Sequence, residues 1–203
     1  MLPSTTAARP PGRPRSPEAD EAIIRATLEL LGEVGYRSLS MELVRSRAGV
    51  GKATIYRRHA CKDDLIKAAL RHLSQDLPVP EDSGSLLGDL EQLAAEGASA
   101  AEATRLPDVY PRLLAEVGHD EELQALFREH MVAPRRAVLR RIFERAIERG
   151  EVRADADLDV AMDMLVGSVV YRGLLSGIDP QTLRARFRIA GEIVLDGLRT
   201  RGA

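Results

Sequence analysis

The sequence predicts an all-α protein with an N-terminal three-helix helix-turn-helix head and a C-terminal helical bundle, about nine helices in all. Three observations support this fold class. Apolar residues recur three and four positions apart through most of the chain, as on the buried face of a helix. The apolar share of 44% is built mostly from Leu, Ala, Val and Ile, of which Leu and Ala favour helices. Gly and Pro separate the periodic segments.

The first expected helix follows an N-terminal arm. Residues 1–16 are rich in Pro, Arg, Ser and Thr and lack a core pattern, so we expect a disordered basic arm. Ser16 can cap a helix and Pro17 suits its first position. The apolar face that follows continues to Val34, and Gly35 is expected to end the helix.

Three shorter helices complete the expected head, residues 17–75. Ser40 can cap a helix over 41–48, and the glycines at 49 and 51 make a tight turn into a helix over 52–59. A fourth helix follows over 61–73. The pair joined by the glycine turn fits a helix-turn-helix, in which the second helix lies in the major groove of DNA.

The charge distribution agrees with a DNA-binding head. From Arg9 to His72 there are 13 Lys and Arg against 8 Asp and Glu, whereas the rest of the chain has 16 against 23. Such asymmetry suggests that the N-terminal part meets a polyanion. A plain helical hairpin with a basic, solvated face stays open as the alternative.

The stretch GYRSLSMELVRSRAGVGKATIYRRHACKDDL resembles the DNA-binding segment of the TetR family of bacterial regulators. The resemblance covers roughly residues 17–70 and matches at many positions in register. It implies that the second helix is anchored to a phosphate and that the third reads the DNA. Some of the expected DNA contacts follow from the resemblance and others from the hydrogen-bonding side chains of the third helix. Together they are Ser40, Lys52, Ala53, Thr54, Tyr56, Arg57, Arg58, His59 and Lys62.

The segment departs from the family pattern at three places. Gly51 stands where a polar residue is common, which removes a helix cap. His59 and Ala60 replace an aromatic-proline pair that orients the next helix, and Cys61 stands where a serine caps it. In the arm, Arg13 and Arg15 are expected either to enter a minor groove or to belong to a solubilising tail.

The C-terminal unit, residues 85–203, is expected to contain helices at about 85–104, 107–118, 120–149, 156–177 and 180–200. Pro134 should kink the long one. The resemblance implies that this unit forms a homodimer and binds a small molecule. Residues of the last two helices are expected at the dimer interface, with ordinary monomer core as the alternative: Leu165, Val169, Leu174, Ile189, Ile193 and Val194.

A ligand cavity is expected among the preceding helices. For each of its candidate residues, ordinary core packing is the favoured alternative: Leu90, Leu93, Tyr110, Leu114, Val117, Phe127, Met131, Met164 and Tyr171. Few charged residues fall on these faces, which favours an apolar effector. The resemblance then implies a repressor of transcription that the effector releases from its DNA operator.

Other classes of protein fit poorly. The four His are scattered and Cys61 is the only cysteine, so no metal, cofactor or catalytic pattern is present and we expect no enzyme. No apolar run approaches the roughly 20 residues that cross a bilayer, and no signal peptide precedes the arm, so we expect a cytoplasmic protein without a membrane partner. A helical adaptor without specific DNA binding is the remaining alternative.

Overall fold

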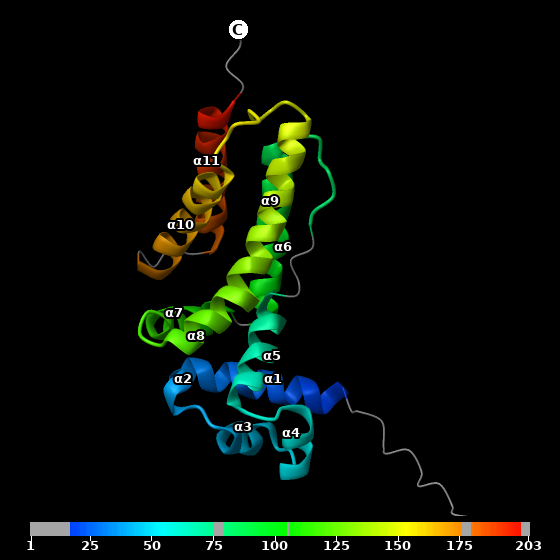
Figure 1. Ribbon diagram of the computed structural model, residues 1–203, viewed down its shortest axis with the longest axis vertical. Helices are drawn as coiled ribbons and strands as arrows, with labels where there is room; N and C mark the ends of the chain where they lie inside the picture. Colours follow the sequence, from blue (N-terminus) through cyan, green and yellow to red (C-terminus); the bar gives the residue numbers. More distant parts are fainter. Residues whose placement is uncertain (1–16, 75–78, 105, 176–179, 200–203) are drawn as a thin grey trace, which may run out of the picture.

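The computed structural model describes residues 17–74, 79–104, 106–175 and 180–199 (Figure 1). Every regular element in these ranges is a helix, which confirms the all-α prediction. The α-helices are α1 (Pro17–Glu33), α2 (Gly35–Ser38), α3 (Met41–Ala48), α4 (Lys52–Arg58), α5 (Lys62–Ser74), α6 (Leu86–Thr104), α7 (Leu106–Val117), α8 (Glu121–Phe127), α9 (Ala133–Glu148), α10 (Leu158–Leu175) and α11 (Pro180–Leu198). No described helix is long and apolar enough to span a membrane.

Helices α1 to α5 form the head and α6 to α11 form the body. In the body, α6 and α9 stand side by side, with α10 and α11 along one flank (Figure 1). Helices α7 and α8 lie between these upright helices and the head (Figure 1). The head therefore meets the body mainly through α7 and α8.

The head contains one helix that the sequence did not predict. Gly35 was expected only to end the first helix. It does so with a φ of +81°, but it also begins the four-residue helix α2. The carboxylate of Glu116 on α7 accepts hydrogen bonds from the backbone N–H groups of this short helix, which local sequence signals do not reveal.

The expected helix over 120–149 is present but is divided. Helix α8 passes into a π-helical turn, Arg128–Val132, and then into α9. Pro134 lies in the first turn of α9 and has no N–H to donate to the carbonyl four residues earlier. The wider π-helical turn directly before it accommodates that missing bond.

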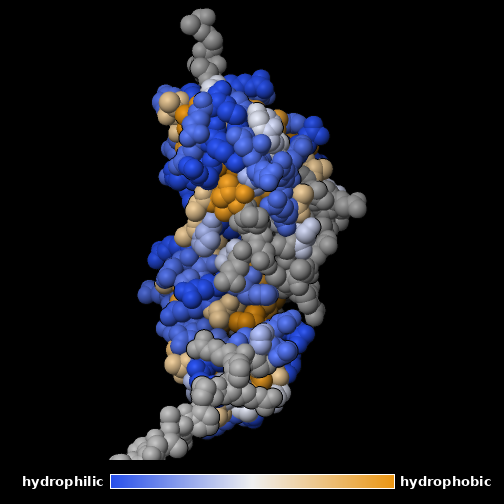
Figure 2. Space-filling model, turned by 90° about the vertical axis from the view of Figure 1, so that its right-hand side faces the viewer, coloured by the Kyte–Doolittle hydropathy of each residue, from blue (hydrophilic) through white to orange (hydrophobic). Residues whose placement is uncertain are grey.

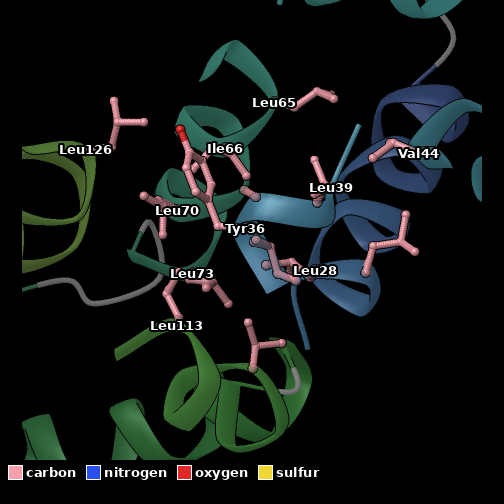
Figure 3. Close-up of a cluster of buried hydrophobic side chains, with 14 of the residues drawn as sticks. Leu28, Tyr36, Leu39, Val44, Leu65, Ile66, Leu70, Leu73, Leu113 and Leu126 are labelled. Atoms are coloured by element: carbon pink, nitrogen blue, oxygen red, sulfur yellow. The ribbon is translucent and has the colours of Figure 1, made fainter. Parts of the chain in front are cut away.

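Two hydrophobic cores hold the molecule together. The first core joins the head helices to α7 and α8, and Tyr36 lies in it among Ile66, Leu70 and Leu113 (Figure 3). The second core joins α6, α9, α10 and α11 around the fully buried Phe143. The first core thus contains residues from both sides of the linker region. The division of the chain into two domains at residues 75–85 stays a prediction.

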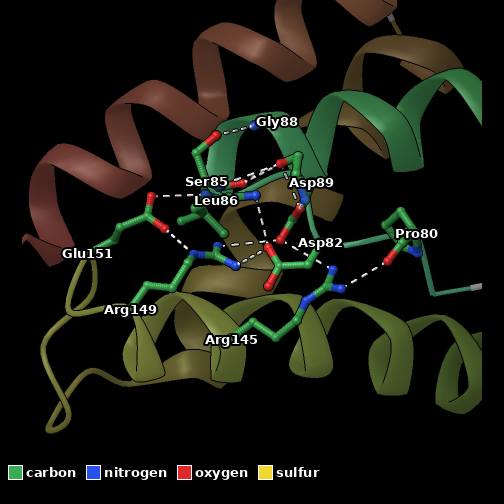
Figure 4. Close-up of polar contacts among 11 residues, drawn as sticks. Pro80, Asp82, Ser85, Leu86, Gly88, Asp89, Arg145, Arg149 and Glu151 are labelled. Carbon is green, nitrogen blue, oxygen red and sulfur yellow. Dashed lines mark hydrogen bonds and ion pairs between the residues drawn. The ribbon is translucent and has the colours of Figure 1, made fainter.

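A buried ionic cluster fixes the segment before α6 against the end of α9 (Figure 4). The Asp89 carboxylate, 0% exposed, pairs with Arg145 at 3.2 Å and Arg149 at 3.4 Å. It also accepts hydrogen bonds from the backbone N–H and the hydroxyl of Ser83, at 2.8 and 2.7 Å. Arg145 further donates to the Pro80 carbonyl. Burial of a carboxylate is tolerated because every face of it meets a donor or a cation.

Candidate nucleic-acid interface

The helix-turn-helix is built by local sequence signals. The Ser40 hydroxyl accepts a hydrogen bond from the Leu43 N–H at 3.3 Å and so caps α3. Gly49 ends α3 with a φ of +65°, a conformation that costs glycine little. Val44 and Ile55 are fully buried and fix the two helices on the head core. The opposite face of α4 is consequently turned outward.

The outward face of α4 carries the residues expected nearest to the bases. Lys52, Ala53, Tyr56 and Arg57 are all exposed, and Thr54 is half-buried next to Gly51. This group, Lys52, Ala53, Tyr56 and Arg57, is called the recognition face below. It combines two cations, a phenol and a small residue that permits close approach to DNA.

Arg58 does not belong to the recognition face. Its side chain is 6% exposed and pairs with Asp20 on α1. Arg58 thus ties α4 to the first helix, and a contact between Arg58 and DNA stays a prediction that this burial disfavours. Helical geometry explains the difference, because adjacent residues point about 100° apart and only one of two neighbouring arginines can lie on a narrow outward face.

Three other arginines of the segment are also used within the protein. Arg45 pairs with Glu42 at 2.5 Å, and Arg47 pairs with Glu33 at 2.7 Å. Arg37 donates a hydrogen bond to a carbonyl on the body. The basic surface is thus narrower than the count of cations in the sequence suggests.

The start of α5 completes the interface. The Lys62 ammonium group lies 3.9 Å from the centre of the Tyr36 ring, a cation–π contact that holds it near α2. His59 ends α4 and is half-buried, and this burial lowers its pKa. The Ala60 N–H donates to the Asp64 carboxylate at 3.1 Å, which helps to cap α5 where Cys61 is exposed. No cluster of metal-ligating side chains occurs in the part of the chain that the structure describes.

The expected ligand residues do not gather in one place. Five of them pack in or against the first core: Tyr110, Leu114, Val117, Phe127 and Met131. Leu90 and Leu93 belong to the second core. Leu90 also lines a cavity of about 210 Å³ between α6 and α11, together with Leu87, Phe187 and Gly191.

Two expected ligand residues lie on the surface. Met164 is 56% exposed and Tyr171 is 59% exposed, both on α10. Neither side chain is enclosed within the body, and their assignment to a ligand site stays a prediction. Val160, Met164 and Tyr171 are spaced by four and then seven residues, about one and two helical turns, so they share one outward side of the helix.

The expected dimer residues also divide into two groups. Leu165 and Val194 are buried in the second core, which favours the monomer-core alternative for them. Val169 is half-buried, whereas Ile189 and Ile193 are exposed. The sequence missed Val160, because α10 has apolar residues on several sides and their spacing alone does not identify the outward one.

The exposed residues define one apolar surface, called the α10–α11 face below: Val160, Met164, Tyr171, Ile189 and Ile193. A groove of about 260 Å³ lies between the two helices here, lined by Val160, Met164 and Ile193 among others. Figure 2 views the molecule from the side opposite α10 and α11, where the surface is mostly hydrophilic with small separate apolar areas. Arg13, Arg15 and the side chain of Leu174 lie outside the described residues.

Comparison with known proteins identifies the same two parts. Residues 23–69 match the family model for bacterial regulatory proteins of the tetR family, and residues 80–187 match the tetracyclin repressor-like C-terminal domain. The chain is 33% identical over 167 residues to YdeS of Bacillus subtilis (strain 168), an uncharacterized HTH-type transcriptional regulator, covering 82% of this chain and 83% of that protein.

Two further comparisons agree. A DNA-binding transcriptional repressor, TetR, of Mycobacteroides abscessus is 37% identical over 115 residues, which cover 56% of this chain and 60% of that protein. The crystal structure of a TetR-family regulator from Syntrophomonas wolfei superposes with a TM-score of 0.76 at 16% identity, covering 91% of this chain and 98% of that one. The chain therefore belongs to the TetR family, and it is a helix-turn-helix transcriptional regulator and not an enzyme.

Proposed function

We propose that the protein is a homodimeric repressor that binds a palindromic operator and is released from it by a small apolar molecule. The observation that carries the proposal is the recognition face. Lys52, Ala53, Tyr56 and Arg57 are outward on a helix whose other side is anchored by the buried Ile55. A rigid helix that presents cations and hydrogen-bonding groups around a small residue suits the major groove.

A second copy of the chain is the proposed occupant of the α10–α11 face. A group of exposed apolar side chains on two helices that pack together is unfavourable in water and favours a partner. Pairing two copies about a two-fold axis buries the same face on both, and it places two recognition helices on one side of the dimer. Two half-sites about one DNA turn apart, roughly 34–36 Å, are then expected.

The proposed effector is a small apolar molecule that binds in the body. The apolar residues around Tyr110 and Phe127, whose ring centres lie 6.0 Å apart, support a site near α7 and α8, which also carry the head. An effector that fits better when the heads are displaced lowers operator affinity by shifting the population of conformations. Repression agrees with the relative from Mycobacteroides abscessus, which is a DNA-binding transcriptional repressor. Because its target is operator DNA, we expect the protein to act in the bacterial cytoplasm.

Selection of bound fragments from random DNA, repeated at several salt concentrations, tests the proposal. We expect an enriched palindrome and an affinity that falls steeply with salt, because Lys and Arg release counterions from phosphates. The double variant Tyr56→Ala/Arg57→Ala should lose this binding and stay folded. Failure to enrich any sequence, or an affinity that does not change with salt concentration, would support the alternative of a helical adaptor without specific DNA binding.

A further inference from the structure

The contact between α7 and α2 is one of two polar contacts described in the head–body junction; in the other, the Arg135 guanidinium on α9 donates to the Leu73 carbonyl on α5 at 2.9 Å. One carboxylate oxygen of Glu116 accepts a hydrogen bond from the Tyr36 N–H at 2.7 Å and a longer one from the Arg37 N–H at 3.4 Å. In return, the Arg37 guanidinium donates to the His119 carbonyl at 2.9 Å. The remaining contact in this region is largely apolar packing in the first core.

The backbone at Gly35 is shaped to receive Glu116. A Cβ atom at this position would lie 1.9 Å from one carboxylate oxygen of Glu116, and φ is +81°. The other side of the carboxylate faces Arg112 on the same helix, whose Nε lies 3.7 Å from it. The carboxylate is thus held at one place and α2 is held against it.

The contact continues from α2 toward the DNA-binding surface. The ring of Tyr36 is buried in the first core, and its hydroxyl lies 3.5 Å from the Asp63 carboxylate on α5. The Lys62 ammonium group, an expected phosphate contact, lies over the same ring. Glu116 on the body and Lys62 on the head therefore contact the same residue from opposite ends.

We infer that Glu116 is a positioning residue: it fixes where the head sits on the body, and through this it sets the half-site spacing that the dimer accepts. The inference depends on the dimeric operator reader proposed above. Apolar packing is non-directional and allows the head to shift against α7. Hydrogen bonds to two consecutive backbone N–H groups are directional and charge-assisted, so they select one position.

Operators with altered spacing test this inference. The dissociation constant is measured for the selected palindrome, for versions with one base pair inserted or deleted between the half-sites, and for an isolated half-site. Wild type and Glu116→Ala are compared, with Glu116→Gln as a milder variant that keeps an acceptor oxygen. Glu121→Ala serves as the control, because it changes net charge equally at an exposed α8 residue with no ion pair among the described residues.

For Glu116→Ala, we expect the preference for the optimal spacing over the altered ones to fall about tenfold, which corresponds to about 1.4 kcal/mol. Half-site affinity should stay at the wild-type value, and Glu116→Gln should fall between the two. A uniform loss of affinity at every spacing, or an unchanged spacing profile, would overturn the inference. If the wild-type protein bound no palindrome at all, the proposed function would be refuted, and this inference with it. That result is distinct from a changed spacing profile in the variants.

Discussion

Arg57 and Arg58 are adjacent in sequence, yet replacement of each by Ala should affect a different property. Arg57 is exposed on the recognition face, where we expect it to neutralise one phosphate in each half-site. Each neutralised phosphate contributes about 0.9 to the slope of log affinity against log salt, so a dimer of Arg57→Ala should lose about 1.8 from that slope. Its thermal stability should match that of the wild type, because no buried contact is removed.

Arg58→Ala should instead destabilise the head. The change removes a guanidinium that is 6% exposed and its pair with Asp20, which is 47% exposed and regains water. A hydrogen bond to a charged group contributes about 1.5–3 kcal/mol, so we expect a loss of about 2 kcal/mol. For a protein of this size that loss lowers Tm by roughly 4–8 °C. The salt slope of operator binding should stay unchanged.

Two measurements distinguish these outcomes. Fluorescence anisotropy with a labelled operator at several salt concentrations gives the slope, and circular dichroism gives Tm at one fixed protein concentration, since dimerisation makes Tm depend on concentration. The reasoning would be refuted if Arg58→Ala lowered the slope with Tm unchanged, or if Arg57→Ala lowered Tm as much as Arg58→Ala.

Three further changes test other parts of the structure. Asp89→Ala should lower the free energy of unfolding by about 3 kcal/mol, because two partly buried guanidinium groups lose a shared carboxylate. The surface variant Asp155→Ala should leave the free energy of unfolding nearly unchanged. Urea unfolding measures both variants, and equal effects would contradict this reasoning. Ile193→Glu places a charge on the α10–α11 face and should yield a monomer in sedimentation; a dimer at micromolar concentration would argue against that interface. Burial lowers the pKa of His130, so its neutral form stabilises the fold above about pH 6.5. That contribution is lost as pH falls toward the lowered pKa. His130→Gln should therefore flatten the acid side of the stability profile; a profile identical to that of the wild type would exclude the effect.

The features that the sequence predicted well are those decided within a few residues. Ser40 caps α3 because a serine hydroxyl reaches the N–H three positions on, and Gly49 ends it because glycine adopts a positive φ at little cost. The recognition helix follows directly from this turn. Its four outward residues were all among the expected DNA contacts.

The features that it did not predict are decided by neighbours far along the chain. The short helix α2 depends on Glu116, 80 residues after Tyr36. Spacing along α10 could not separate Leu165, buried in the second core, from Met164, exposed beside it, because both are apolar and only packing against other helices decides between them. The ion pair of Arg58 was not predicted for the same reason, since its partner Asp20 lies on another helix.

The π-helical turn Arg128–Val132 has a consequence for the rotational phase of the long helix. Each residue of an α-helix turns the chain by about 100°, but the wider π turn takes up one additional residue without that extra rotation. Before the turn, Leu123 and Phe127 point into the first core; after it, Ile142 and Phe143 point into the second. A single helix thus serves two cores whose directions a regular helix would not match. If the same residues formed a regular α-helix here, everything after the turn would be rotated by about 100°, and the two halves of the protein would be out of phase although no side chain had changed.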